Sequence, residues 1–129
     1  MSKIVKKDEK FREEINCIKD KIRPIEIGKN GHIMEWNKEW DEPEKEHRHV
    51  SHLFALHPGT QINNINNKKY DEACKKTLES RGNGGTGWSM AWKINFWARL
   101  YDGERAYRLL KALLTPVRPE SDKDAGGTY

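Results

Sequence analysis

The apolar positions near the start of the chain repeat at helical spacing. They stand three, four or seven residues apart, with Lys and Glu between them: Ile4, Phe11, Ile15, Ile18 and Ile22. This period predicts an amphipathic helix over residues 4–22. Pro24 ends it, because the residue before a proline is driven from helical towards extended geometry.

Two short alternating runs follow, one on each side of Asn30-Gly31. The Asn-Gly pair is a strong signal for the tight turn of a β-hairpin. The sequence therefore predicts a short hairpin within residues 25–36, with arms at Ile25–Ile27 and His32–Trp36. Glu35 then lies at the end of the second arm.

Helical periods interrupted by turns continue to about residue 114. Pro43 is well placed to open a helix over residues 44–56, which Pro58-Gly59 stops. Its expected buried side chains are Val50, Leu53, Phe54 and Leu56. Further helices are predicted over residues 69–80, 88–101 and 104–114. The last two are so closely joined that they must lie antiparallel, as an αα-hairpin.

The pattern describes a single segment, residues 1–129, of all-α class. It holds about five helices, αα-hairpins and one short β-hairpin, with helices and ligand loops over residues 44–114 and an irregular tail over residues 115–129. Long loops are expected at one end of the helices. These elements do not make a closed fold.

Composition changes this picture in one respect. The chain has 129 residues, of which 35% are hydrophobic and 34% charged, yet it carries five tryptophans. Disordered chains are poor in aromatic residues, so several tryptophans are expected to line a cleft or cover a neighbouring segment. The chain therefore reads as a piece of something larger.

Charge and apolar run lengths argue against several classes of partner. The formal net charge of +4 is spread among mixed signs, which is typical of a solvated surface, and no nucleic-acid signature appears. No apolar run is long enough for a membrane span, and this segment has no signal peptide, so the compartment stays open. The cysteines, Cys17 and Cys74, fall on predicted helix faces and are expected to be buried thiols rather than a disulfide.

The densest chemistry lies in His47-Arg48-His49-Val50-Ser51-His52. Metal sites on helices use histidines four residues apart, and no two of these have that spacing, so no metal site and no cofactor are predicted. Packing is the expected role of His52 and His57. For Arg48 and His49, hydrogen bonds to a polar ligand and pairing with Asp41 or Glu42 remain equally open.

Two further features suit a polar ligand. Glu35, flanked by Met34 and Trp36, has the setting of a general acid, but a substrate contact or a salt bridge to Arg48 fits it better. The glycine-rich run over residues 82–87 lacks the Gly-Lys-Ser/Thr ending of a phosphate loop. Trp88, which follows it, is the candidate ligand contact on a stripe where Trp92 and Phe96 are expected in the core.

Several long motifs occur in one order: residues 25–36, 41–43, 47–53 with Pro58-Gly59, 81–89 and 92–100. Together they closely resemble glycoside hydrolase family 95, over the stretch from about Ile22 to Tyr129. The best-known members of that family are inverting α-L-fucosidases, and some act as α-L-galactosidases.

The resemblance implies an (α/α)6 barrel of six helix pairs, of which this chain holds about two and a half. It implies that the bond-breaking groups lie elsewhere: an asparagine pair and a glutamate upstream, and an aspartate downstream of Gly126-Gly127-Thr128-Tyr129. None of these 129 residues is therefore expected to be catalytic. Arg48 and His49 match a position that touches the sugar, while Glu35 and Trp36 match a motif near the same pocket.

The expected partners are a fucosylated oligosaccharide or glycan and the rest of the catalytic domain. We expect the chain alone to be inactive, and to self-associate through apolar surface that an incomplete barrel exposes. The alternative is a carbohydrate-binding or partner-binding helical module without catalysis. A small nucleic-acid binder, favoured only by the mild positive charge, ranks third.

Overall fold

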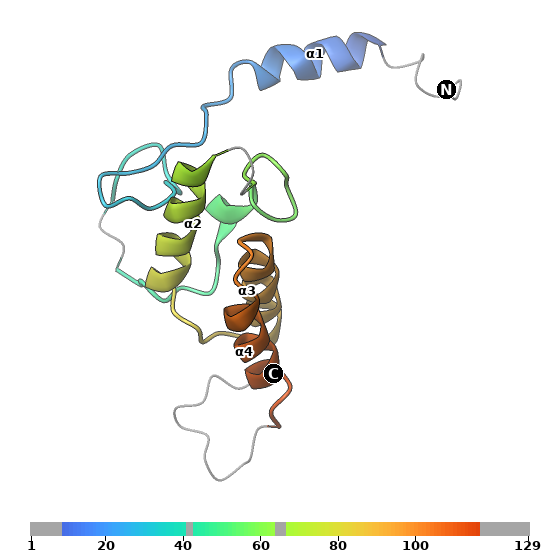
Figure 1. Cartoon of the computed structure of the whole chain (residues 1–129). Helices are drawn as coiled ribbons and strands as arrows, with labels where there is room; N and C mark the ends of the chain where they lie inside the picture. The colour runs from blue at the N-terminus through green and yellow to red at the C-terminus, as the bar shows by residue number, and fades with distance from the viewer. Residues whose placement is uncertain (1–8, 41–42, 64–66, 117–129) are drawn as a thin grey trace.

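The computed structural model describes residues 9–40, 43–63 and 67–116 (Figure 1), and its regular elements are helices. In chain order they are α1 (Glu9–Lys19), the 3-10 helix η2 (Ser51–Leu53), α2 (Lys68–Ser80), α3 (Gly87–Arg99) and α4 (Gly103–Leu113). The all-α prediction is confirmed, with four α-helices in the described residues. Figure 1 shows α1 apart from a group formed by α2, α3, α4 and the loops around them.

α3 and α4 form the predicted αα-hairpin and pack against each other. Tyr101 makes the turn between them with a positive φ of 59°. Asp102 then caps α4, because its carboxylate accepts a hydrogen bond from the Arg105 N–H at 3.0 Å. The Arg105 guanidinium also stacks over the Trp97 ring at 4.3 Å, which ties the two helices together.

α2 also follows its prediction closely. Its buried face holds Asp71, Ala73, Cys74, Thr77 and Leu78. Gly82 ends the helix in the left-handed conformation, with φ +65°, and its N–H donates to the Glu79 carbonyl. The apolar period and the glycine together were sufficient to place this element.

The predicted β-hairpin over residues 25–36 is wrong. The described residues of this segment contain only an isolated antiparallel bridge between Ile27 and Ile33. The turn itself forms, and Gly31 adopts a positive φ of 78° within it. Two strands do not follow from it.

Two backbone hydrogen bonds flank this bridge, from the Gly28 N–H to the His32 carbonyl and from the Met34 N–H to the Glu26 carbonyl. Backbone groups that face away from the bridge bind side chains of α2. The Ile33 N–H donates to the Thr77 hydroxyl at 3.0 Å, and the Ile25 carbonyl accepts from the Tyr70 hydroxyl at 2.8 Å. These groups point away from the facing arm, so the contacts hold the segment on α2 without taking part in the pairing of the two arms. The segment therefore keeps its turn and one bridge, and it lies against α2 without extending into two strands.

The predicted helix over residues 44–56 is also wrong. Only η2 is helical there, and Val50 before it has φ −137° and ψ 48°, outside the helical region. Val50, Leu53 and Leu56 are buried as expected, but Phe54 is 56% exposed. The spacing of Val50, Leu53 and Leu56 by three is typical of a helix, but it also occurs in an irregular segment that packs on a core.

The core gathers side chains from the irregular segments and from the last three helices. Its buried members are Ile33, Val50, Leu53, Leu56, Ile62, Ala73, Cys74, Leu78, Phe96, Trp97, Leu100 and Leu109. α1 contributes none, and Cys17 on it is exposed, contrary to the prediction of a buried thiol. α1 falls within the predicted helix 4–22, of which residues 4–8 lie outside the described residues. Among the described helices, none is long and apolar enough to cross a membrane.

Candidate functional site

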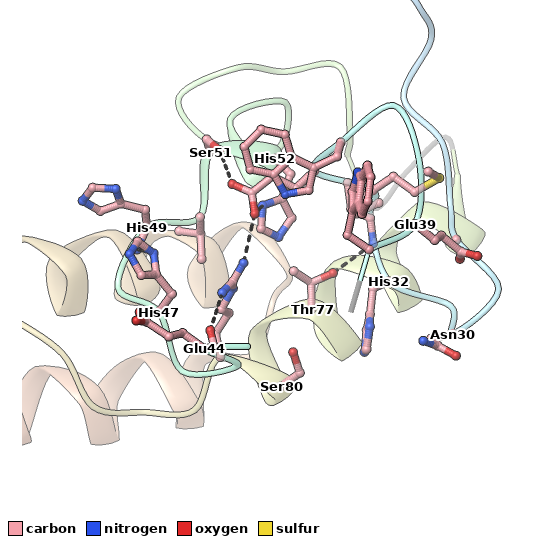
Figure 2. Close-up of a pocket in the computed structure, with 18 of the residues that line it drawn as sticks. Asn30, His32, Glu39, Glu44, His47, His49, Ser51, His52, Thr77 and Ser80 are labelled. Atoms are coloured by element: carbon pink, nitrogen blue, oxygen red, sulfur yellow. Dashed lines mark hydrogen bonds and ion pairs between the residues drawn. The ribbon is translucent and has the colours of Figure 1, made fainter. Parts of the chain in front are cut away.

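A cavity of about 1120 Å³ opens between the irregular chain and the helices. We call residues 25–40 and 43–63 the loop wall, and α2 with α3 and the turn between them the helical wall. The loop wall lines most of the cavity, and the helical wall adds Thr77, Ser80, Arg81, Trp88 and Trp92. Figure 2 shows labelled side chains from both walls around this space.

Four of the five predicted substrate-binding residues line this cavity: Glu35, Trp36, His49 and Trp88. They come from three separate parts of the sequence, so the fold has brought them together. Arg48 is exposed and is not among the lining residues. Its proposed partners Asp41 and Glu42 lie outside the described residues.

Glu35 is held at both carboxylate oxygens. Oε1 accepts from the Ser51 hydroxyl at 2.7 Å, and Oε2 accepts from the Arg81 guanidinium at 3.1 Å (Figure 2). The His52 Nδ1 atom lies 3.5 Å from the same Oε2. The predicted salt bridge to Arg48 is therefore replaced by one to Arg81, whose side chain is only 2% exposed.

Arg81 and Lys93 are the two cations at the centre of the helical wall, and both are buried. Arg81 also donates to the Glu44 carbonyl at 3.3 Å, so it joins α2 to two points of the loop wall. The Lys93 ammonium donates to the carbonyls of Arg81 and Gly84, at 3.2 and 2.6 Å. Burial, and next the Arg81 charge, lower the pKa of Lys93, while Glu46 acts to raise it.

His49 lies against Trp88, with the two ring centroids 5.3 Å apart. On its other side the His47 ring meets it edge-on at 4.8 Å. The backbone below is fixed, because the Ser89 hydroxyl donates to the Arg48 carbonyl at 2.9 Å. An imidazole and an indole, exposed side by side, combine hydrogen-bonding nitrogens with an apolar face.

For His52 and His57 the sequence predicts packing roles. His57 meets Trp92 and Phe96 edge-on, at 5.7 and 6.2 Å, which is a packing role. The side chain of His52 is 4% exposed, although it also borders the cavity. No group of three or more His, Cys, Asp or Glu in the described ranges has the arrangement of a metal site.

The cavity extends well beyond the predicted residues. Figure 2 shows His47 and His49 near one end and Asn30, His32 and Glu39 near the other, with Ser51, His52 and Thr77 between them. Trp40, directly after Glu39, also lines the cavity. We call Asn30, His32, Glu39 and Trp40 the distal end.

Sequence reasoning missed the distal end and Arg81. Arg81 was detectable, because it follows Thr77 and Leu78 at steps of four and three on the buried stripe of α2. A guanidinium on such a stripe requires an acidic or carbonyl partner. The distal end had only the high tryptophan content as a signal.

A model of the glycosyl hydrolase family 95 catalytic domain matches residues 1–129. The chain belongs to this family. The resemblance drawn from the motifs is therefore confirmed.

Three proteins similar to this chain carry fucosidase names. The chain is 42% identical over 110 residues to "Alpha-L-fucosidase 2" of Arabidopsis thaliana, which covers 84% of the chain and 13% of that protein. It is 36% identical over 107 residues to "Probable alpha-fucosidase A" of Aspergillus niger, covering 78% of the chain and 14% of that protein. A protein of the same name from Aspergillus oryzae is 34% identical over 109 residues, 73% of the chain and 15% of its own length. The chain thus matches about one seventh or less of the length of these family 95 relatives.

Proposed function

We propose that this chain forms part of the L-fucose-binding wall of a family 95 α-L-fucosidase catalytic domain. The observation that carries the proposal is the meeting of Glu35, Trp36, His49 and Trp88 at one cavity of about 1120 Å³. Sugar hydroxyls donate hydrogen bonds to carboxylates and exchange them with imidazole nitrogens, while the apolar face of the ring stacks on indole. The names of the relatives point to the same sugar.

Within this site His49 and Trp88 make the direct contacts, since both rings are exposed to the cavity. Glu35 holds the loop wall against Arg81 and retains lone pairs for a sugar hydroxyl. Arg48 has its backbone fixed by Ser89 and its side chain in solvent. The Arg48 guanidinium can contact the sugar only if its side chain turns towards the cavity.

We place the groups that break the glycosidic bond on other parts of the domain. Inverting hydrolysis needs an acid and a base facing each other across the sugar, about 6.5–9.5 Å apart. Glu35 is engaged at both oxygens, and Glu39 accepts from the Lys29 N–H and lies near its ammonium. In the described residues, neither carboxylate is presented as half of such a pair. The isolated chain is then expected to bind the sugar and to leave an aryl α-L-fucoside intact.

The proposal also implies that the chain is an arc of an (α/α)6 barrel. Four large apolar side chains are 45–66% exposed: Phe11, Ile15 and Ile18 of α1, and Ile22 after its end. Tyr107 and Leu110 of α4 are likewise exposed, by 57 and 40%, and so is its C-cap Leu114, by 71%. We propose that neighbouring helices of the domain cover both stripes. Without those helices, the isolated chain is expected to self-associate through the same surfaces. A monodisperse monomer in sedimentation velocity, with a sharp melting transition, would contradict this.

Titration of the isotope-labelled chain with methyl α-L-fucoside tests the sugar site. Proton–nitrogen NMR spectra should show shifts of the Trp88 indole signal, and His49→Ala should abolish them. The matched control is His32→Ala, which changes an imidazole at the opposite end of the cavity and should leave the titration unchanged. Methyl α-D-glucoside serves as the control ligand.

Two outcomes would overturn the proposal. One is a Trp88 signal that does not respond to the fucoside, or that responds equally in His49→Ala. The other is hydrolysis of an aryl α-L-fucoside by the chain alone at ordinary enzyme rates, abolished by Glu35→Gln. The second result would make Glu35 the general acid.

A further inference from the structure

The sequence contains two Asn-Gly pairs, Asn30-Gly31 and Asn83-Gly84. An asparagine followed by glycine is the pair most prone to deamidation, because glycine has no Cβ to obstruct its own backbone nitrogen. That nitrogen attacks the side-chain carboxamide of the asparagine, so the peptide group between the two residues must be free to rotate. Both asparagines are exposed, and the difference between the pairs lies in how the glycine N–H groups are held.

The pair Asn30-Gly31 is held in its turn. The Gly31 N–H donates to the Gly28 carbonyl at 2.9 Å, and an antiparallel bridge joins the two arms just outside the turn. The Lys76 side chain lies against the same residue, since a Cβ built on Gly31 would meet the Lys76 Nζ atom at 2.9 Å. The Gly31 nitrogen can therefore attack Asn30 only after the turn has opened.

The pair Asn83-Gly84 lies in the turn between α2 and α3 (Figure 1), which is anchored on both sides of the pair but not within it. Before it, the Gly82 N–H donates to the Glu79 carbonyl, and after it the Gly84 carbonyl accepts from the Lys93 ammonium at 2.6 Å. In the described part of the chain, neither the Gly84 N–H nor the Asn83 side chain makes a hydrogen bond. A Cβ built on Gly84 would meet no atom within 4 Å, so the space around this residue is open.

We propose that Asn83 is a site of spontaneous deamidation, which the fold leaves open while it protects Asn30. The Gly84 nitrogen gives its proton to hydroxide and bonds to the Asn83 Cγ atom. The Cγ–Nδ2 bond breaks as the departing nitrogen takes a proton from water and leaves as ammonia. A second water then opens the five-membered imide at either carbonyl, so that position 83 becomes aspartate or isoaspartate.

The isoaspartate product changes the turn more than the aspartate product does. Both add a negative charge two residues after Arg81, but isoaspartate also adds one carbon to the main chain directly before Gly84. This displaces the Gly84 carbonyl, which is one of the two carbonyls that hold the buried Lys93. The isoaspartyl form is therefore less stable than a form that carries the same charge on a normal backbone.

Peptide mapping of the aged chain tests the proposal. The chain is incubated in mildly alkaline buffer and digested with trypsin, which releases residues 30–38 and 82–93 as separate peptides. Chromatography with mass spectrometry then measures the aspartyl and isoaspartyl products, and an unaged sample corrects for conversion during digestion. Asn83 should convert about tenfold faster than Asn30, because the Gly31 hydrogen bond must break before attack at that pair. In urea that unfolds the chain, the two rates should converge.

Gly84→Ala is the matched variant. A Cβ fits at this position without a clash, and its φ lies outside the left-handed region, so the fold should remain. The added methyl group obstructs the attacking nitrogen, and conversion of Asn83 should slow severalfold while that of Asn30 is unchanged. Asn83→Asp reproduces the charge alone, and the purified isoaspartyl form should unfold at a lower urea concentration than this variant.

Three results would overturn the proposal. They are conversion of Asn30 as fast as that of Asn83 in the folded chain, a ratio of the two rates that is the same in urea and in buffer, and undiminished conversion in Gly84→Ala. An isoaspartyl form as stable as Asn83→Asp would refute the effect assigned to the turn. None of these readouts involves sugar binding, so they decide the proposal whether or not the proposed function holds.

Discussion

The two walls of the cavity are each stabilised by different interactions. The helical wall buries an apolar face on each helix, including Ala73, Cys74 and Leu78 of α2 and Phe96 and Trp97 of α3. The loop wall contains little regular structure, and its own backbone hydrogen bonds include those of turns, such as the Gly31 N–H to the Gly28 carbonyl and the His57 N–H to the Leu53 carbonyl. For further backbone hydrogen bonds it depends on side chains of the helical wall.

The dependence can be followed contact by contact. Side chains of α2, α3 and the turn between them bind loop-wall backbone at the positions Ile25, Ile33, Glu44, Arg48, Leu56 and Gly59. These contacts place Glu35, Trp36 and His49 without a strand or an α-helix beneath them. The comparison teaches that the helices shape this site through polar side chains that bind the backbone of a loop, in addition to the apolar core that both walls share.

The largest test of this difference is Arg81→Met, which removes the buried guanidinium from both Glu35 and the Glu44 carbonyl. Breaking a buried ion pair by removing one partner costs about 3 kcal/mol in the free energy of unfolding. Urea denaturation should show that loss, and amide exchange should accelerate in the loop wall more than in α3. Arg108→Met, on the exposed face of α4, is the matched control.

A double-mutant cycle with Glu35→Gln isolates the ion pair. The loss from Arg81→Met should shrink when position 35 is already Gln. An Arg81→Met variant as stable as the parent chain would show that the loop wall does not depend on this residue.

Alkaline pH tests the burial of a thiol in the helical wall. Burial, and next the nearby Asp71 charge, raise the pKa of the Cys74 thiol from 9.0 to about 12. A raised pKa of an acid means that its stabilising contribution is complete below pH 9 and is lost as pH rises towards 12. At pH 10.5 the folded chain should have lost about 2 kcal/mol relative to pH 8 through this group.

Comparison of variants reveals that loss, since other groups titrate in all of them. Cys74→Ala should flatten the difference between pH 8 and pH 10.5 by about 2 kcal/mol in urea denaturation. Cys17→Ala, which changes the exposed cysteine of α1, should leave the pH dependence as it is. Equal slopes in both variants would refute a buried neutral thiol at position 74.

The smallest expected effect concerns one contact between the walls. Thr77→Val keeps the shape of the side chain but removes the acceptor of the Ile33 N–H, which leaves a buried donor without a partner. The expected cost is about 1.5 kcal/mol in the free energy of unfolding. Thr77→Ser keeps the hydroxyl and should retain most of the stability, and a Val variant that equals it would contradict the role given to this contact.

Sequence patterns sufficed for the helical wall because its signals are local. The buried stripe of α2, the left-handed Gly82 and the turn before Asp102 all lie within a few residues of what they determine. A helical period of apolar residues is enough to predict such an element, because the surface against which it packs only has to be apolar.

The loop wall was mispredicted because its determinants lie far away in the sequence. Ile33 is fixed by Thr77, which stands 44 residues later, and Ser89 fixes Arg48 across 41 residues. Nothing next to either backbone group announces such a partner. The motifs did identify Glu35, Trp36, His49 and Trp88 as a set, whereas the position of Arg48 outside the cavity depends on side-chain direction.

Lys93 gives this architecture an internal reporter. Amine acylation needs a solvent-exposed, uncharged amine, and this one is shut in between the end of α2 and the carbonyl of Gly84. A surface lysine such as Lys10 would be labelled at once, while Lys93 would be labelled only when that corner of the molecule opens. The rate of its labelling would therefore measure how often the turn between α2 and α3 opens.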